Sequence, residues 1–178
     1  EEANIVDDIN IRNATFSSMH KALNGLNVLP DYLLVDGVGI TMAAKWIYNK
    51  RVKRYTGPDF HQDFLKYYQK IGGGKIFYMG SSNITLNKIS KKIENLYNNI
   101  DTETFSPPFK QEFSEEDNSL IIQEINNYKP DVLFVGLTCP KQEKWVEINK
   151  NRLNVKLIAS IGAEFDFKEI AKLIGSEH

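Results

Sequence analysis

Short apolar runs that end near a glycine, each followed by a helical pattern, constrain the fold of this chain more than any other feature. These runs are typical of buried strands, and they are Tyr32–Val35, Lys75–Met79, Asp131–Val135 and Lys156–Ile161. Strands that alternate with helices along a chain form a parallel sheet with both faces covered. We therefore predict an α/β fold, with a Rossmann-like, mostly parallel sheet and helices on both faces.

Apolar residues at helical spacing mark the helices between these strands. The most regular stripe follows a helix start at Gly80 to Asn83 and contains Leu86, Ile89, Ile93, Leu96 and Ile100. Further helices are predicted from Ile40, from Pro58, from the capping run at Ser114 and from Pro140. The segment 102–112, which contains two adjacent prolines, is predicted to be a loop.

Length and composition favour one compact domain. The 178 residues are 42% hydrophobic, enough to bury one continuous core, so residues 1–178 are assigned to a single domain. The net charge of -1 argues against nucleic acid as a partner. The single cysteine, Cys139, cannot form an internal disulfide, and no stretch is apolar over the length of a membrane span. With no secretory leader at its start, the chain is expected to be cytoplasmic.

Four strand ends are predicted to converge on one edge of the sheet, and this edge is the candidate site. The residues there are Asp36 and Gly37, Gly80 to Asn83, Gly136 to Gln142, and Gly162 to Asp166. Free backbone amides at the helix starts after Gly80 and Pro140 would suit a diphosphate. The glycine pattern matches neither the dinucleotide fingerprint nor the phosphate loop, which disfavours a dinucleotide oxidoreductase.

Each candidate residue also has an ordinary structural interpretation. Asp36 could be a general base at a strand end or a capping residue before a glycine. The run Lys141-Gln142-Glu143 could flank a ligand, or Glu143 could close a capping box. Arg54 could neutralise a diphosphate or lie in a solvated basic loop.

Metal chemistry has little support in the sequence. His20 and His61 have no partner at zinc-ligand spacing, and the aspartates form no Asp-x-Asp pair, so no metal and no cofactor are expected. Cys139 has no histidine near it in sequence, which favours a packing role over a nucleophilic one.

Five sequence blocks together resemble the WecG/TagA/CpsF glycosyltransferases, glycosyltransferase family 26. In chain order they are Asp36-Gly37-Val38-Gly39-Ile40, Arg54-Tyr55-Thr56-Gly57-Pro58-Asp59, Ser106-Pro107-Pro108-Phe109, Val135 to Trp145 with its Pro-Lys-Gln-Glu string, and Gly162-Ala163-Glu164-Phe165-Asp166-Phe167. The resemblance runs from about Asp31 to Phe167.

This resemblance implies an inverting, metal-independent hexosyltransferase that uses a UDP-sugar, with N-acetylmannosamine as the best guess. The acceptor would be a sugar on undecaprenyl diphosphate, in bacterial teichoic acid or capsule synthesis. Asp36 would be the catalytic base, Arg54 would serve the diphosphate, and Gln142 the donor sugar. The substrate-binding residues would be Gly37, Gly39, Gly80, Ser81, Asn83, Gly136, Pro140, Lys141, Glu143 and Asp166.

The resemblance also implies a peripheral location at the inner face of the bacterial plasma membrane, with homo-oligomer formation left open. Thr138 and Glu164 depart from the family pattern, and the family's C-terminal tail is expected to be cut off or replaced at 168–178. A different UDP-hexose or UDP-hexuronate donor, or a catalytically weakened nucleotide-sugar-binding module, are therefore alternatives. Asn10, Asn13 and Thr15 compete for an acceptor-side position that the family fills near its N-terminus.

Overall fold

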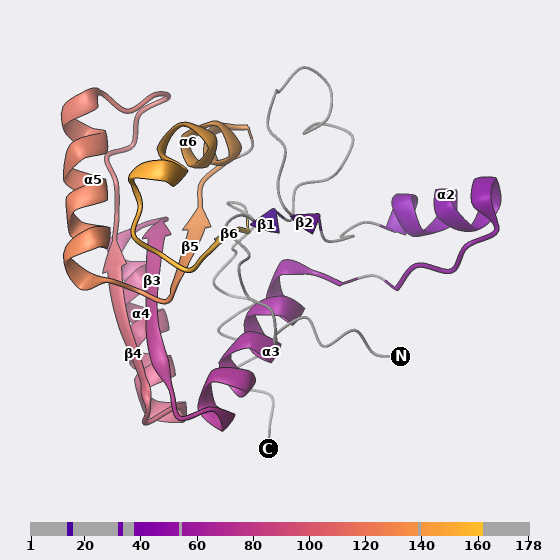
Figure 1. Cartoon of the computed structure of the whole chain (residues 1–178), viewed down its shortest axis with the longest axis horizontal. Coiled ribbons are helices and arrows are strands. Elements are labelled where there is room, and N and C mark those ends of the chain that lie inside the picture. The colour runs from indigo at the N-terminus through magenta and orange to yellow at the C-terminus, as the bar shows by residue number, and fades with distance from the viewer. Residues whose placement is uncertain (1–13, 16–31, 34–37, 54, 139, 162–178) are drawn as a thin grey trace.

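A parallel sheet of six strands organises the part of the chain that the structure, a computed structural model, describes: residues 14–15, 32–33, 38–53, 55–138 and 140–161. The strand order is β2 (Tyr32–Leu33), β1 (Ala14–Thr15), β6 (Leu157–Ser160), β5 (Val132–Gly136), β3 (Gly74–Gly80) and β4 (Ile100–Phe105). All five neighbouring pairs are parallel. The predicted α/β fold is thus confirmed (Figure 1).

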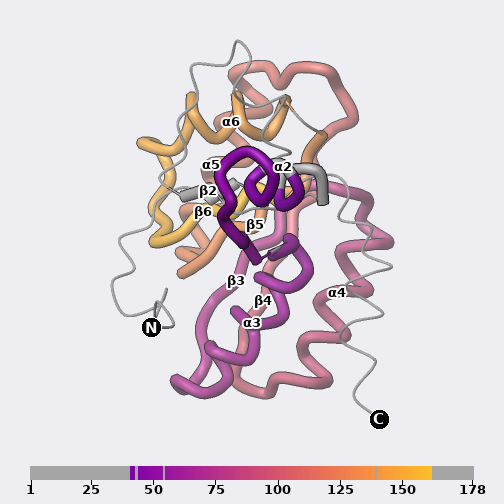
Figure 2. The backbone as a smooth tube through the Cα atoms, turned by 90° about the vertical axis from the view of Figure 1, so that its right-hand side faces the viewer, coloured from indigo at the N-terminus to yellow at the C-terminus, as the bar shows by residue number. Residues whose placement is uncertain are grey.

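Helices cover both faces of this sheet. α3 (Gly57–Lys70) and α4 (Asn83–Leu96) bury side chains in one core cluster with β3 and β5. α5 (Glu115–Tyr128) and α6 (Lys141–Asn149) bury theirs in a second cluster, and the short 3-10 helix η1 (Lys150–Arg152) follows α6. Figure 2 shows α4 and α6 on opposite sides of the strands. α2 (Val38–Tyr48) projects from this body in Figure 1.

Alternation along β3 and β5 explains how each strand supplies both cores. Ile76 and Tyr78 face the α3 and α4 side, whereas Phe77 and Met79 face the α5 and α6 side. Successive side chains of a strand point to opposite faces, so a run with no polar residue is what a doubly covered strand requires. Tyr78 stacks on Phe134 of β5, with ring centroids 5.4 Å apart.

Local capping signals fix where three helices begin. Thr56 caps α3 and Ser114 caps α5, each with an aspartate three residues later that accepts from the cap amide and completes a capping box. Ser82 caps α4 by accepting from the Thr85 amide at 3.3 Å. The predicted helix starts at Pro58, Ser82 and Ser114 are therefore confirmed to within a residue or two.

The prediction for residues 100–112 was wrong in part. Ile100 is the first residue of β4 and does not extend the α4 stripe, and 102–105 belong to that strand instead of a loop. β4 lies at the edge of the sheet, and its sequence alternates polar and half-buried residues, so it has no apolar run to mark it.

A buried histidine gives one stability prediction. His61 of α3 is 1% exposed, and its Nε2 lies 2.7 Å from the Tyr78 hydroxyl. Burial lowers the pKa of His61 from 6.5 to about 3. The unfolded chain therefore takes up a proton that the folded chain does not, and stability should fall as the pH drops from about 6.5 towards 3.

We expect His61→Gln to make the free energy of unfolding fall less steeply as the pH drops. The slope should decrease by up to about 1.4 kcal/mol per pH unit, the contribution of one proton. Urea unfolding of both proteins between pH 7 and pH 4 measures it. The carboxylates, including Asp131 and Asp117, titrate in both proteins. Their contribution therefore cancels when the unfolding free energies of the two proteins are subtracted at each pH. Parallel stability curves for the two proteins would contradict the buried neutral state of His61.

Candidate functional site

The sheet has a topological switch point between β3 and β5. From β3 the chain passes through α4 to β4 on one side, and from β5 it passes through α6 to β6 on the other. In open α/β sheets, ligands bind in the crevice outside the carboxyl ends of the strands at such a point. β3 ends at Gly80 and β5 ends at Gly136, and these two residues are paired in the strand register.

The backbone of Gly136 approaches Gly80 so closely that Gly80 has no room for a side chain. Gly80 has a φ of 127°, which residues with side chains rarely adopt, and a Cβ added there would overlap the carbonyl oxygen of Gly136. The edge of the sheet at the ends of β3 and β5 therefore consists of main chain at Gly80 and Gly136, and a ligand at the switch point would meet peptide groups there.

The chain turns sharply out of β3 to start α4. Ser81 lies in the left-handed region with a φ of 58°, and its carbonyl accepts a hydrogen bond from Ser106 Oγ at 2.7 Å. Asn83 follows the cap residue Ser82 and is exposed. The predicted residues Gly80, Ser81 and Asn83 thus lie together at the carboxyl edge, beside the positive end of α4. Ser106, which follows β4, ties the two strand ends together.

The start of α6 lies on the other side of the crevice. Pro140 is the cap residue and makes no side-chain cap hydrogen bond. Gln142 and Glu143 are 1% and 2% exposed, and Gln142 Nε2 donates to Glu143 Oε1 at 2.9 Å. The capping-box interpretation of Glu143 is therefore wrong, since its carboxylate pairs with the neighbouring amide and does not close back on the cap residue.

Two buried oxygens near this edge have no hydrogen-bond partner in the described part of the chain. One is Glu143 Oε2, in the first turn of α6, and the other is Ser160 Oγ, at the end of β6. Buried polar atoms are almost always paired, so each such exception is a place where a water molecule, an ion or a ligand group would supply the missing hydrogen bond. Sequence analysis missed Ser160, although a serine that ends an otherwise apolar strand could have been noticed.

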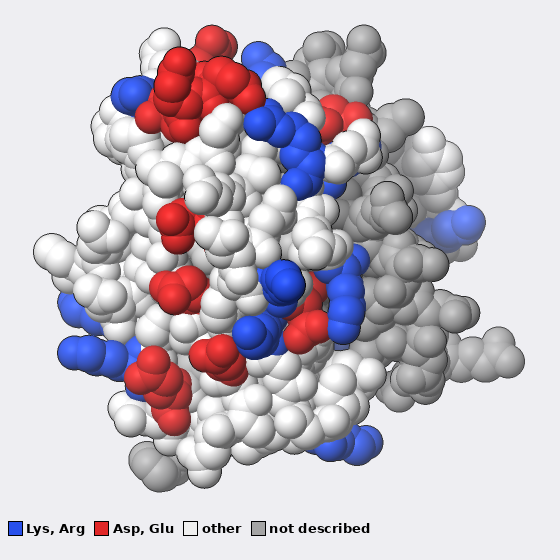
Figure 3. All heavy atoms as spheres, turned by 60° about the vertical axis from the view of Figure 1, so that its left-hand side comes forward, with Lys and Arg blue, Asp and Glu red and all other residues white. Residues whose placement is uncertain are grey.

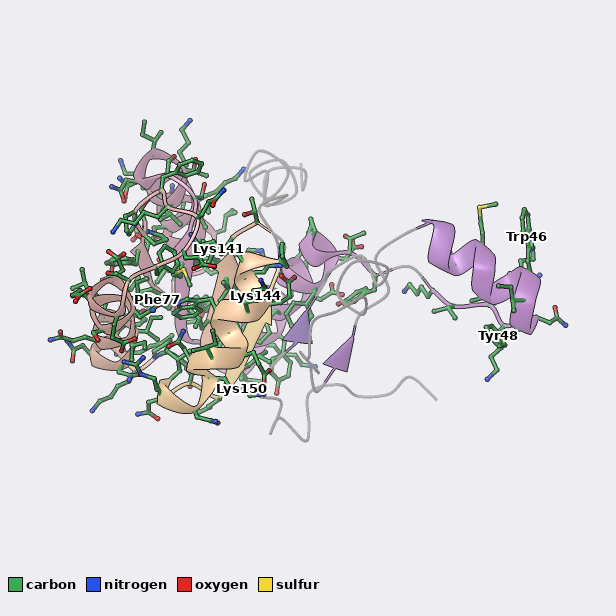
Figure 4. All side chains as sticks on the ribbon, turned by 90° about the horizontal axis from the view of Figure 1, so that it is seen from above. Trp46, Tyr48, Phe77, Lys141, Lys144 and Lys150 are labelled. Carbon is green, nitrogen blue, oxygen red and sulfur yellow. The ribbon has the colours of Figure 1, made fainter. Side chains whose placement is uncertain are left out.

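Lys141 contacts the segment between β4 and α5. Its ammonium lies 3.6 Å from the centroid of the Phe113 ring and donates to the Lys110 carbonyl. Burial lowers its pKa. Beside it lies a pocket of about 420 Å³ between α6 and the segment that precedes α5, with Phe113, Trp145 and Lys144 among its lining residues. Figure 4 labels Lys141 and Lys144 on α6.

The start of α3, which follows the basic sequence segment 50–54, also lies at the carboxyl edge of the sheet. Gly57, the first residue of α3, is buried, and a Cβ added there would touch Ile161, just beyond β6, at 3.7 Å. Tyr55 donates from its hydroxyl to Asp63 Oδ2 at 2.6 Å. The Thr-Gly-Pro-Asp part of the second motif therefore has a structural role, because it caps α3 and brings this segment to the candidate site.

Several predicted site residues lie outside the described residues, namely Asp36, Gly37, Arg54 and Asp166, and so does Cys139. The strand that precedes Asp36 is described: β2 ends at Leu33, is parallel to the rest of the sheet and so ends at the same edge as Gly80 and Gly136. Gly39 lies in the first turn of α2. Thr15 ends β1 beside Ser160, whereas Asn10 and Asn13 lie outside the described residues.

The surface of the described residues carries no broad positive field on the face in Figure 3. Acidic and basic side chains are interspersed there, and acidic residues gather where α5 begins, at Glu115, Glu116 and Asp117. Among the described residues, no group of three His, Cys, Asp or Glu side chains could hold a metal ion. None of the described helices has the length and apolar character needed to cross a membrane.

The fold and the candidate site together define a class: a doubly wound α/β domain whose sheet has a switch point next to the starts of two helices, the place where such folds bind ligands. A sequence model of the glycosyl transferase WecG/TagA/CpsF family matches residues 9–169. The chain therefore belongs to the WecG/TagA/CpsF family of glycosyl transferases, as the five motifs predicted.

Curated relatives carry a more specific name. Over 151 residues the chain is 23% identical to an N-acetylglucosaminyldiphosphoundecaprenol N-acetyl-beta-D-mannosaminyltransferase of Staphylococcus aureus strain MRSA252. Proteins of the same name from strains NCTC 8325 / PS 47 and COL are 22% identical over the same length. Each match covers 85% of this chain but 57% of the relative.

Proposed function

We propose that this chain is the catalytic part of a hexosyltransferase that moves N-acetylmannosamine from a UDP-sugar to a sugar on undecaprenyl diphosphate. The observation that carries the proposal is the switch point of the sheet, where β3 and β5 end at the paired residues Gly80 and Gly136 and the helices α4 and α6 begin. Helix starts bind anions through free amides and the helix dipole, and the donor would present a diphosphate to them. The family and the names of its relatives supply the sugar and the lipid.

The proposed mechanism is inverting and needs one base and one positively charged group. Asp36 would remove the proton from the acceptor hydroxyl, and Arg54 with the helix-start amides would stabilise the departing UDP. Gln142 would orient the donor sugar, with Gly37, Gly39 and Asp166 beside it. No metal ion and no cofactor enter this mechanism, and the enzyme would act peripherally at the inner face of the plasma membrane, where its acceptor is held.

The test is UDP release by the chain with a panel of donors and a short-chain diphosphate-linked N-acetylglucosamine acceptor. We expect UDP-N-acetylmannosamine to give the highest kcat/KM. Faster turnover of another UDP-hexose or a UDP-hexuronate would replace the donor assignment while leaving the reaction class intact. Binding of UDP with no turnover of any donor would favour the alternative, a nucleotide-sugar-binding module.

A second prediction concerns the buried amide at the start of α6. Gln142→Ala should raise the donor KM by about tenfold, because a buried hydrogen bond of the bound state is lost and its partner is left unpaired. Asn149→Ala is the matched control, since Asn149 is also 1% exposed and donates to the Trp145 carbonyl at the far end of the same helix. Equal donor KM values in the two variants would remove Gln142 from the donor site.

A further inference from the structure

We propose that α2, together with the basic segment after it, docks the protein on an anionic membrane surface. This inference rests on the proposed function in one respect: a lipid-linked acceptor is the reason for the protein to bind a membrane. α2 is almost entirely apolar, and Lys45 is the one charged residue among its 11 residues. A helix that is apolar on most sides requires an apolar environment, and in water this one lacks it.

The exposure of the α2 side chains is far above that of an ordinary surface helix. Trp46, Ile47 and Tyr48 are 77%, 71% and 72% exposed, and Met42 is 44% exposed. α2 projects from the sheet and its covering helices, as Figures 1 and 4 show. Four large apolar side chains on an 11-residue helix form a patch that some partner must cover.

The order of residues around α2 fits a helix that lies flat in a membrane interface. At about 100° per residue, Trp46 and Tyr48 stand on either side of Ile47, and Lys45 stands roughly opposite Ile47. Figure 4 shows Trp46 and Tyr48 projecting from opposite sides of α2. With Ile47 deepest, both aromatic rings would lie at the level of the lipid headgroups, where Trp and Tyr are enriched, and Lys45 would face water.

Charge identifies the partner as an anionic surface. Lys50, Arg51 and Lys53 follow α2 and are exposed, and they form no ion pair within the described part of the chain. Between Asp36 and Asp59 the sequence has no acidic residue at all. Basic residues beside a membrane-bound helix each strengthen binding to an anionic leaflet about fivefold.

Length and position limit how α2 can meet the bilayer. Its 11 residues extend about 16 Å, half of the roughly 30 Å hydrocarbon core, so the helix would lie on the membrane without spanning it. α2 begins just after β2, whose end lies at the same sheet edge as the crevice. Docking through α2 would therefore turn the carboxyl edge, where the acceptor must arrive, towards the membrane.

Vesicle binding by the full chain tests this proposal. The probes are vesicles of phosphatidylcholine alone and vesicles with about 30 mol% phosphatidylglycerol, whose negative surface attracts basic segments. We expect co-sedimentation with the anionic vesicles, weakened at high salt, and a blue shift of Trp46 fluorescence. The other tryptophan, Trp145, is 5% exposed and should report little change, and Trp46→Phe should keep binding while losing the signal.

Variants identify the element that docks. The double variant Trp46→Ser with Tyr48→Ser should weaken vesicle binding at least tenfold, because two large apolar side chains no longer leave water. Ile71→Ser is the control, since Ile71 is 54% exposed at the end of α3. Changing Lys50, Arg51 and Lys53 to Gln should weaken binding about fivefold per charge, whereas Lys88→Gln with Lys91→Gln on α4 should not. The three basic residues lie outside any helix or strand, so these changes do not depend on α2 folding.

Three outcomes would overturn the proposal. The first is wild-type protein that fails to bind anionic vesicles, and the second is binding that the α2 and basic variants leave unchanged. The third is a concentration-dependent dimer, detected by analytical ultracentrifugation, that the Trp46 and Tyr48 changes disperse, since a second copy would then cover α2. UDP release with a water-soluble acceptor, measured without vesicles, reports on the proposed function separately, because docking variants should retain it.

Discussion

Gly80→Ala should cost the protein about 3 kcal/mol or more of its folding free energy, the sum of backbone strain at positive φ and overpacking. Gly80 has a φ of 127°, and an added methyl group would overlap the main chain of Gly136. Neither strand can move away easily, because β3 and β5 are central strands held by hydrogen bonds on both sides. The change should also displace the main chain at the ends of β3 and β5 and so weaken the proposed binding of UDP.

Gly72→Ala is the matched control for this prediction. Gly72 also has a positive φ, 102°, but no described atom lies within 4 Å of the position of an added Cβ. Its substitution should therefore cost only the backbone strain, about 1–2 kcal/mol. Urea unfolding followed by circular dichroism measures both variants, provided that their m-values agree. Equal losses of stability would contradict the close approach of Gly80 and Gly136.

Much of the fold could be predicted because its signals are local. β5 is an unbroken apolar run, and β3 and β6 are apolar apart from one polar residue at an end. The helices α3, α4 and α5 follow residues whose side chains cap the helix directly. Such features depend on neighbours within a few positions, so a single sequence contains them. β4 was missed because the exposed residues Asp101 and Glu103 alternate with its other residues at the edge of the sheet, which removes the apolar run that marks a central strand.

The candidate site was predictable in location but not in detail. Parallel strands bring their carboxyl ends to one edge, so the convergence of Gly80 and Gly136 follows from topology. Their close approach depends on the register of two strands more than fifty positions apart in the chain, which local patterns do not determine. Likewise Gln142 and Glu143 are polar residues in a polar run, and only tertiary packing places both below 3% exposure.

Burial of Glu143 changes how the Pro-Lys-Gln-Glu motif is understood. A carboxylate in the first turn of a helix is stabilised by the helix dipole, which offsets part of the cost of burying it. Its pairing with Gln142 holds the amide in one orientation, with one carboxylate oxygen left without a partner among the described residues. The motif thus gives the site a fixed pair of polar groups that a sugar hydroxyl could complete, which fits a role in binding the donor.

Asp36→Asn is expected to have the largest effect on activity. If Asp36 is the base, its loss should lower kcat by about 10²- to 10⁴-fold, the usual contribution of general base catalysis. Asparagine keeps the shape of the side chain but cannot accept the proton of the acceptor hydroxyl. The affinity for UDP should change little, because the base acts on the acceptor and not on the diphosphate. UDP release and UDP binding, measured on the same preparation, separate the two effects.

Asp101→Asn provides the comparison, since Asp101 is an exposed carboxylate at the start of β4, on the opposite edge of the sheet. This variant should keep both turnover and affinity. Turnover by Asp36→Asn at the wild-type rate would assign the base to another residue. A wild-type chain that binds UDP but releases none from any donor would instead make Asp36 a capping residue of a binding module. The rate of UDP release and the affinity for UDP, measured in these proteins, thus decide whether Asp36 is the catalytic base or a capping residue. They also decide whether the chain is an enzyme or a binding module.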